Sequence, residues 1–301
     1  MEPTPPRLLE LCRRLKLPTV AREAAHRAEL SARQGVRPLD FVLELLEAEL
    51  DERDQRRALR RTREAGFPLV KTLEGFDFRR NPDVPEARLR QLADGGYIDN
   101  AEPILLLGDP GTGKTHLATA LGVEAARQGR SVRFVTAAAL VTELIEAKDA
   151  HELGRVVARY ARTDLLILDE LAYLPMTHAD SELLFRVLGE RQERRPIIVT
   201  TNLPFSEWTS MIPDPRLCRA IVDRLTHKAH IIDTGKRSIR LEESLARQRR
   251  QASRAQPEAP PNQRSGGANS RDQVGPKQVD KPRASRSSAA RLLRRRPIRH
   301  A

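Results

Sequence analysis

The chain has 301 residues, of which 39% are hydrophobic, so it is long enough to bury a sizeable core and to form one to three domains. No apolar run approaches the roughly 18 residues that would span a bilayer, and the N-terminus lacks the apolar segment of a secretory signal, so we expect a cytoplasmic protein. The net charge of +12 lies almost entirely at one end, because residues 243–301 carry +11 and the rest of the chain only +1. Whether residues 1–242 bind nucleic acid must therefore be judged from their sequence motifs and not from the net charge.

The N-terminal region reads as helical. Residues 7–33 place apolar side chains at mostly helical spacing and contain Pro18, which predicts two short amphipathic helices. A longer helix is expected to end near Ala65, with Asp40 as its N-terminal cap. Its second half, residues 51–64, is charged all round. We interpret this half either as a solvated face or as a surface for a partner or for phosphates.

A connector, KTLEGFDFRRNPDVPEARLRQL, follows at residues 71–92. Its Phe76 and Phe78 either fill the core of the next domain or help to shape a base pocket. Beyond Asn100, strand and helix patterns alternate, which predicts an α/β domain with a parallel sheet flanked by helices on both faces. The expected strands are residues 104–107, 131–135, 164–170, 196–202 and 230–233, and the expected helices are residues 137–148, 151–161, 180–194 and 215–226.

The stretch PILLLGDPGTGKTHLATALG, residues 103–122, is the strongest functional signal. It joins a buried strand to a helix through the pattern GxxxxGKT, in which loop amides and the helix N-terminus hold phosphate oxygens. Lys114 would reach the outer phosphates, and the Thr115 hydroxyl would bind Mg²⁺. A glycine-rich turn without a ligand would not explain the Lys-Thr pair, so the sequence predicts a site for a nucleoside triphosphate, with ATP expected. The predicted ATP-binding residues are Gly108, Asp109, Pro110, Gly111, Thr112, Gly113, Lys114, Thr115 and His116.

The segment LLILDE, residues 165–170, supplies the second motif. Asp169, at the carboxyl end of a buried strand, would hold Mg²⁺ directly or through water, and Glu170 would activate the attacking water. A P-loop kinase acting on a small molecule does not need such a base. The pair therefore predicts ATP hydrolysis, and a capping Asp-Glu pair at a strand end is the alternative interpretation.

The third motif is VTTN, residues 199–202, at the end of the next strand. Asn202 can hydrogen-bond the γ-phosphate or the attacking water and so sense which nucleotide is bound. A turn-forming Asn before Leu-Pro is the alternative interpretation.

The histidines and cysteines do not indicate a metal centre. His116, His227 and His230 lack further ligands at zinc spacing, so we expect packing or surface roles for them. Cys12 and Cys218 lie far apart and are expected to be reduced, buried thiols.

Several segments together resemble the IstB family of AAA+ ATPases, which assist insertion-sequence transposases and are similar to DnaC-type helicase loaders. The resemblance covers roughly residues 8–242. The segments that carry it are LKLPTVAREA, KTLEGFDF, GDPGTGKTHLATALG, LLILDELAYLP, LLFRVLGERQERRPIIVTTNLPFSEW and IVDRLTHKAHIID.

The resemblance implies a homo-oligomer that uses ATP and Mg²⁺ to bind and remodel duplex DNA. It implies an N-terminal helical domain, residues 1–68, that binds the partner transposase, followed by an AAA+ ATPase domain, residues 69–243. The composition of residues 244–301 predicts a disordered basic tail, which either binds nucleic acid or is a solvated extension without a function.

In AAA+ proteins a neighbouring subunit contributes an arginine finger that offsets charge in the transition state. Arg224, in VDRL, matches that element, with Arg216 and Arg219 as nearby alternatives. Arg240, in GKRSIRL, lies where the family has a second sensor, although Ile239 replaces the aromatic residue that usually precedes it.

Other functions stay open at this point. A DnaC-like helicase loader would use the same ATPase core, a small-molecule kinase would need neither DNA nor assembly, and a non-catalytic DNA-binding scaffold would use ATP only to assemble. The chain has only eleven aromatic residues, so few side chains are available to stack on the bases of a single strand. We therefore expect binding to duplex DNA through phosphates, largely without sequence preference.

Overall fold

The computed structural model describes residues 3–172, 175–240 and 244. The predicted tail at 244–301 lies outside the described residues except for Ser244. None of the helices in the described ranges is both long enough and apolar enough to cross a membrane.

Three helices form the N-terminal region: α1 (Pro6–Leu15), α2 (Pro18–Gln34) and α3 (Pro38–Glu64). Each starts with a proline in its first turn, where the missing N–H costs no hydrogen bond. The prediction that Asp40 caps the long helix was wrong, because Pro38 starts the helix and makes Arg37 the cap residue. Asp40 lies in the first turn and binds Arg37 (Nε to Oδ2, 2.6 Å). A small core of Cys12, Val20, Ala24 and Leu45 joins the three helices.

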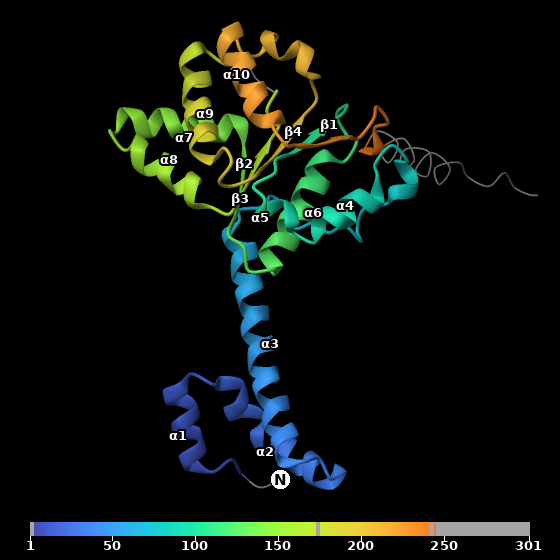
Figure 1. Ribbon diagram of the computed structural model, residues 1–301, viewed down its shortest axis with the longest axis vertical. Coiled ribbons are helices and arrows are strands. Elements are labelled where there is room, and N and C mark those ends of the chain that lie inside the picture. Colours follow the sequence, from blue (N-terminus) through green and yellow to red (C-terminus); the bar gives the residue numbers. More distant parts are fainter. Residues whose placement is uncertain (1–2, 173–174, 241–243, 245–301) are drawn as a thin grey trace, which may run out of the picture. The chain divides into compact units, whose positions relative to one another are not determined.

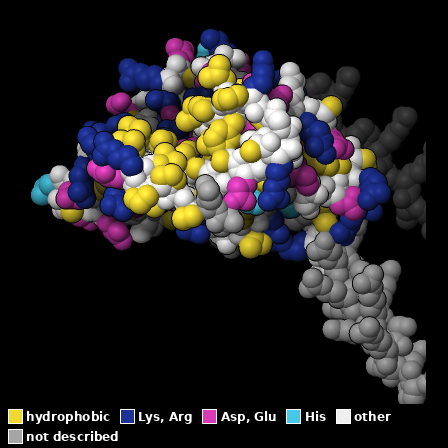
Figure 2. Space-filling model, turned by 90° about the horizontal axis from the view of Figure 1, so that it is seen from below, with side chains coloured by type: hydrophobic (Ala, Val, Ile, Leu, Met, Phe, Trp, Pro, Cys, Tyr) yellow, Lys and Arg dark blue, Asp and Glu magenta, His cyan; other side chains and the backbone are white. Residues whose placement is uncertain are grey.

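Helix α3 also has apolar side chains that no other described part of the chain covers. Their spacing of three and four residues puts them on one side of the helix. The space-filling view from below shows hydrophobic side chains gathered on one face (Figure 2). The exposed apolar residues in the first half of α3 are Leu39, Val42, Leu43, Leu46 and Leu50.

The second part is built on a five-stranded parallel sheet in the order β2-β3-β4-β1-β5 (Figure 1). All residues of β3 and β4 are buried, as expected for apolar strands covered on both faces. The strand β4 separates β3 from β1, so the LLILDE and P-loop strands are not neighbours. The strands are β1 (Ile104–Leu107), β2 (Val132–Thr136), β3 (Leu165–Asp169), β4 (Ile197–Thr201) and β5 (His230–Asp233).

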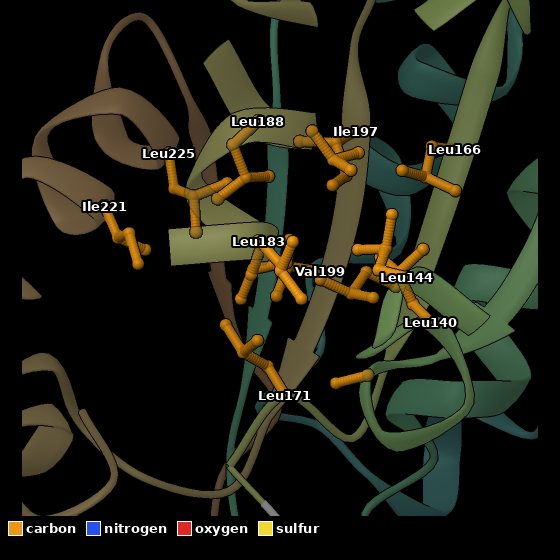
Figure 3. Packing of buried hydrophobic residues seen from close by; sticks show 14 of the residues in the cluster. Leu140, Leu144, Leu166, Leu171, Leu183, Leu188, Ile197, Val199, Ile221 and Leu225 are labelled. Carbon is orange, nitrogen blue, oxygen red and sulfur yellow. The ribbon is translucent and has the colours of Figure 1, made fainter. Parts of the chain in front are cut away.

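Helices cover both faces of the sheet, because successive strand residues point to opposite sides. On one face, Leu166, Leu168 and Val199 pack against four helices. Figure 3 shows Leu166 and Val199 beside leucine side chains of these helices. On the other face, Leu165 and Ile167 pack against three helices. The first set is α7 (Ala137–Asp149), α8 (Leu153–Arg162), α9 (His178–Arg191) and α10 (Pro215–Thr226), and the second is α4 (Glu86–Ala93), α5 (Gly96–Asp99) and α6 (Lys114–Arg127).

The α/β fold class predicted from the sequence is confirmed: N-terminal helices precede a five-stranded parallel sheet that helices flank on both faces. The boundaries of the predicted strands and helices differ from the observed ones by at most three residues. Four short elements escaped prediction because each is too brief to show a period. They are α4, α5 and the 3₁₀ helices η1 (Phe78–Arg80) and η2 (Phe205–Ser210).

Candidate nucleotide-binding site

The phosphate-binding loop occupies residues 108–113 between β1 and α6. Gly108 and Gly113 have φ values of 141° and 100°, which L side chains rarely adopt. A Cβ atom at Gly113 would lie 2.5 Å from the Phe76 ring, and one at Gly108 would lie 2.8 Å from the Gly235 carbonyl. The loop therefore needs glycine both for its backbone and for its close neighbours. Because α6 starts at Lys114, the unpaired amides of its first turn adjoin the loop and provide an anion site.

Lys114 lies across this loop. Its Nζ donates hydrogen bonds to the carbonyl oxygens of Gly108 (2.6 Å) and Asp109 (2.8 Å). Burial lowers the pKa of the ammonium, and the nearby carboxylates of Asp109 and Asp169 offset only part of that shift. The cation is thus fixed beside the amides that would hold phosphate oxygens.

Thr115 and Asp169 meet as the sequence predicted. The Thr115 hydroxyl donates to both carboxylate oxygens of Asp169, at 3.0 and 3.2 Å. Asp169 is 4% exposed at the end of β3. A hydroxyl and a carboxylate are the hard oxygen ligands that Mg²⁺ prefers, so the donor set fits this ion.

Glu170 and Asn202 lie on one cavity of about 660 Å³ with the P-loop. Glu170 directly follows β3, is exposed, and has a left-handed backbone with φ of 56°. Asn202 is exposed just past the end of β4. Arg240 also lines this cavity, and the N–H of the preceding Ile239 binds the Gly111 carbonyl (3.1 Å), so the missing aromatic residue does not keep Arg240 away. The loop and α6 residues that line the cavity are Pro110, Gly111, Gly113, Lys114, Thr115, His116 and Thr119.

Residues of the connector before the P-loop also line this cavity. Phe76 is 6% exposed and belongs to the core, as one interpretation predicts. It also lines the cavity, so its role in a base pocket stays a prediction. Its ring meets those of Phe78 and His116 edge to face, with centroids 4.8 and 5.2 Å apart. The Nε2 atom of His116 donates to the Thr72 carbonyl (2.9 Å), and burial lowers the pKa of the imidazole. His116 therefore packs the connector against α6.

Three of the predicted ATP-binding residues belong to the loop but do not line the cavity: Gly108, Asp109 and Thr112. The carbonyls of Gly108 and Asp109 hold Lys114, as described above. Thr112 is fully buried, and its hydroxyl lies 2.6 Å from that of Thr234. These residues therefore support the conformation of the loop through their hydrogen bonds.

Arg224 lies outside this cavity. Its guanidinium stacks on the Phe185 ring, 3.6 Å from the ring centroid, and donates to the Phe185 carbonyl (3.1 Å). It lines a second cavity of about 220 Å³. Arg216 and Arg219, the alternative fingers, are exposed on the same helix, α10.

His227 and His230 contact charged side chains, and the two cysteines are free thiols. His230 bonds Glu102 through Nε2 (2.8 Å) and the Arg88 guanidinium through Nδ1 (2.7 Å). His227 lies 3.7 Å from a Glu193 oxygen. Cys12 and Cys218 are buried and unpaired, as predicted.

A family model described as IstB-like ATP binding protein matches residues 10–247. The chain belongs to the IstB-like family. Its relatives include the protein assigned as the ATP-binding protein of insertion sequence IS5376 in Geobacillus stearothermophilus, which is 36% identical over 81% of this chain and 98% of the relative. The counterpart from insertion sequence IS21 in Pseudomonas aeruginosa is 37% identical over 77% of this chain and 88% of the relative.

Among solved structures, AMPPCP-bound DnaA from Aquifex aeolicus is similar to the IstB-like chain with a TM-score of 0.49 and 19% identity, covering 62% of this chain and 56% of that one. The DnaC helicase loader is similar with a TM-score of 0.42 and 19% identity, covering 49% of this chain and 87% of that one. Similarities at this level concern no more than the fold.

Sequence reasoning missed two buried side chains of this IstB-like site. Asn81 is fully buried and donates through Nδ2 to the carbonyls of Thr112 (3.1 Å) and Thr234 (2.9 Å). It ties the connector and the segment after β5 to the rear of the P-loop. The only local signal at Asn81 is an Asn-Pro pair, which reads as a turn. The other missed residue is Thr200, on β4, which contacts the Asp169 carboxylate at the end of β3 and the backbone N–H of Glu170 just after it.

Proposed function

We propose that this IstB-like protein is a Mg²⁺-dependent ATPase that assembles on duplex DNA and directs the transposase of its insertion sequence to that DNA. The observation that carries the ATPase is the contact between Thr115 and Asp169, beside an exposed Glu170 on the P-loop cavity. This arrangement joins a phosphate site, a magnesium ligand set and a base for water. The family match to insertion-sequence proteins favours the transposition role over the helicase-loader alternative.

In the proposed reaction, the loop amides and Lys114 hold the phosphates of ATP, and Thr115 and Asp169 hold the ion. The bound Mg²⁺ supplies positive charge that neutralises the phosphate oxygens. Glu170 takes a proton from the attacking water, and Asn202 orients that water or the γ-phosphate. Arg240 adds a further cation at the same cavity.

Arg224 completes the site from a neighbouring subunit in this proposal. It lies on a different cavity from the P-loop of its own chain, so it can serve only a second copy without a rearrangement. We therefore place the ATPase domain, residues 69–243, in a homo-oligomer with its nucleotides between subunits.

The N-terminal helical domain, residues 1–68, is proposed to bind the transposase. Its support is the exposed apolar row in the first half of α3, since contiguous apolar surface of this kind is typical of protein interfaces. The basic tail at 244–301 adds a nonspecific attraction to DNA phosphates in this proposal.

The test of hydrolysis is Glu170→Gln in the purified protein with ATP, Mg²⁺ and duplex DNA. We expect hydrolysis to fall by roughly 100-fold or more, as for loss of a general base. ATP binding should persist, because the P-loop and Asp169 are untouched. Lys114→Ala is the matched comparison, since it should lose ATP binding as well. Hydrolysis by Glu170→Gln at the wild-type rate would refute the role of Glu170.

A further inference from the structure

Thr200 sits between the two acidic residues of the site. It lies on β4, is 1% exposed, and belongs to the strand next to β3. Its Oγ1 atom is 2.6 Å from Oδ1 of Asp169 and 2.9 Å from the backbone nitrogen of Glu170. One hydroxyl therefore contacts both the residue that holds the ion and the residue that follows it.

The chemistry of the three groups fixes the direction of both hydrogen bonds. An ionised carboxylate can only accept and a backbone N–H can only donate, whereas a hydroxyl has one proton and two lone pairs. Thr200 must therefore donate to Asp169 and accept from Glu170. The Thr115 hydroxyl donates to the same carboxylate from α6, so Asp169 is held from two elements.

The backbone of Glu170 needs such support. Its φ of 56° lies in the left-handed region, which a residue with a side chain adopts at an energetic cost. The N–H of Glu170 binds the Thr200 hydroxyl, and the N–H of Leu171 binds the Thr200 carbonyl (3.0 Å). Thr200 thus holds the turn that aims the Glu170 side chain at the cavity.

We propose that Thr200 is a positioning residue that couples the magnesium carboxylate to the catalytic base; this rests on the proposed ATPase function. A change in the orientation of Asp169 on binding the ion reaches the backbone of Glu170 through a single hydroxyl. Glu170 then points at the cavity only when the Asp169 carboxylate has the orientation that binds the ion.

The test is Thr200→Val, which keeps the shape of the side chain and removes the hydroxyl. We expect kcat to fall about 10- to 100-fold, with a comparable rise in the Mg²⁺ concentration that half-saturates the enzyme, as for other residues that orient metal ligands. The KM for ATP should change little. Thr200→Ser should restore most of both properties, because it returns the hydroxyl. Thr200→Val should add little to the loss in Glu170→Gln, since both act through one base.

Thr201→Val is the matched control for burial. Thr201 is also 1% exposed on β4, but its hydroxyl bonds the backbone of Leu203 instead of Asp169 or Glu170. We expect its Mg²⁺ requirement to stay at the wild-type value. A Thr200→Val enzyme with wild-type kcat and Mg²⁺ requirement would overturn the proposal, as would failure of Thr200→Ser to rescue a folded protein.

ATP binding at varied Mg²⁺ gives a readout that does not depend on turnover. If the wild type hydrolyses no ATP, the proposed function fails, and this titration still decides the role of Thr200. A higher Mg²⁺ requirement for ATP binding in Thr200→Val than in Thr201→Val would support its hold on Asp169. Equal requirements would overturn it.

Discussion

Glu49 shows how a single buried side chain can replace a local helix cap. It lies on α3 and is 2% exposed, and its Oε2 accepts the N–H groups of Thr19 (2.7 Å) and Val20 (3.1 Å). These are free donors in the first turn of α2, whose own cap residue, Leu17, offers no side-chain acceptor. The other oxygen, Oε1, binds Arg53 at 3.0 Å. The carboxylate therefore joins α3 to the start of α2.

This arrangement makes stability depend on pH. Burial alone would raise the pKa of Glu49, but the two backbone donors and Arg53 together lower it below its ordinary value. The unfolded chain therefore binds the proton more readily, and the stabilisation is fully present above the unfolded pKa of about 4.3 and is lost as pH falls through the lower folded pKa. We expect Glu49→Gln to lower the free energy of unfolding at pH 7 by about 1–3 kcal/mol, and the difference from wild type to shrink below about pH 4.

Urea unfolding at pH 7 and at several acid pH values would measure this difference. Glu47→Gln is the matched control, because Glu47 is exposed on the same helix. A Glu49→Gln deficit that is the same at all pH values would contradict the role of the charge.

Some residues of the site can be predicted from a local sequence motif, and others cannot. Lys114 and Thr115 stand in one contiguous pattern, and Asp169 and Glu170 end a run of apolar residues, so spacing alone predicts them. Asn81 contacts a carbonyl 153 residues away, at Thr234. Such a contact leaves no pattern in the sequence, because it depends on which elements the fold brings together.

At the scale of elements, one buried side chain closes the junction of α8, α9 and β4. Arg191 is the last residue of α9 and is 1% exposed. Its guanidinium donates to the carbonyls of Tyr160 (2.5 Å) and Thr163 (2.9 Å) at the end of α8, and to that of Pro196 (2.6 Å) just before β4. The carbonyls of Tyr160 and Thr163 lie at the end of α8, where the last carbonyls of a helix lack an intrahelical partner, so the planar five-donor group satisfies both of them. It also bonds the Pro196 carbonyl, which accepts the Leu166 N–H as well (3.5 Å).

We expect Arg191→Met to lower the free energy of unfolding by about 3 kcal/mol or more, because several buried carbonyls lose their donor. Arg191→Lys should recover only part of the loss, since one ammonium cannot match the geometry of the guanidinium. Equilibrium denaturation would measure both variants. Arg194→Met, at an exposed position three residues on, should change stability by less than about 0.5 kcal/mol. An Arg191→Met protein as stable as Arg194→Met would refute this role.

The elements themselves were largely predictable, since β3 and β4 are runs of apolar residues and the helices between them keep a clear period. The helix predicted to reach residue 194 ends at Arg191 because that side chain turns inward and the chain then leads into β4. The periodicity of α9 could not reveal this, because a charged residue at the end of a helix is usually exposed.

At the scale of the whole molecule, alternation predicts a parallel sheet but not the order of its strands. The observed order puts β4 between β3 and β1, the strand that leads into the P-loop. Asp169 and Thr200 therefore lie on adjoining strands, β3 and β4. The P-loop, Asp169 and Thr200 all lie at the carboxyl edge of the sheet, where ligands bind in such folds. The strand order thus accounts for how these residues meet within one chain. Arg224 lies on another cavity, so its proposed role requires a second subunit and is tested separately.

The last prediction concerns that assembly. In a ring or filament built by head-to-tail contacts, each ATP site would join the P-loop of one subunit to Arg224 of the next. Arg224→Ala should then bind ATP but lose most hydrolysis, at least about 100-fold, because the transition state loses a cation. Lys114→Ala should fail for the opposite reason, since it keeps Arg224 but lacks a working ATP site. Arg155→Ala, at an exposed position of α8, is the control for loss of an arginine side chain.

Mixing the two inactive variants distinguishes a finger in trans from a structural role. An Arg224→Ala subunit with an intact P-loop can meet a Lys114→Ala subunit with an intact Arg224, so about a quarter of the interfaces in an equal mixture would be complete if subunits pair at random. ATPase activity should therefore reappear on mixing and rise with protein concentration. If Arg224 only stabilises α9 through Phe185, each Arg224→Ala subunit stays defective whatever its neighbour, and the mixture stays inactive. An inactive mixture of folded subunits that still co-assemble would thus reject Arg224 as the finger and direct attention to Arg216 or Arg219.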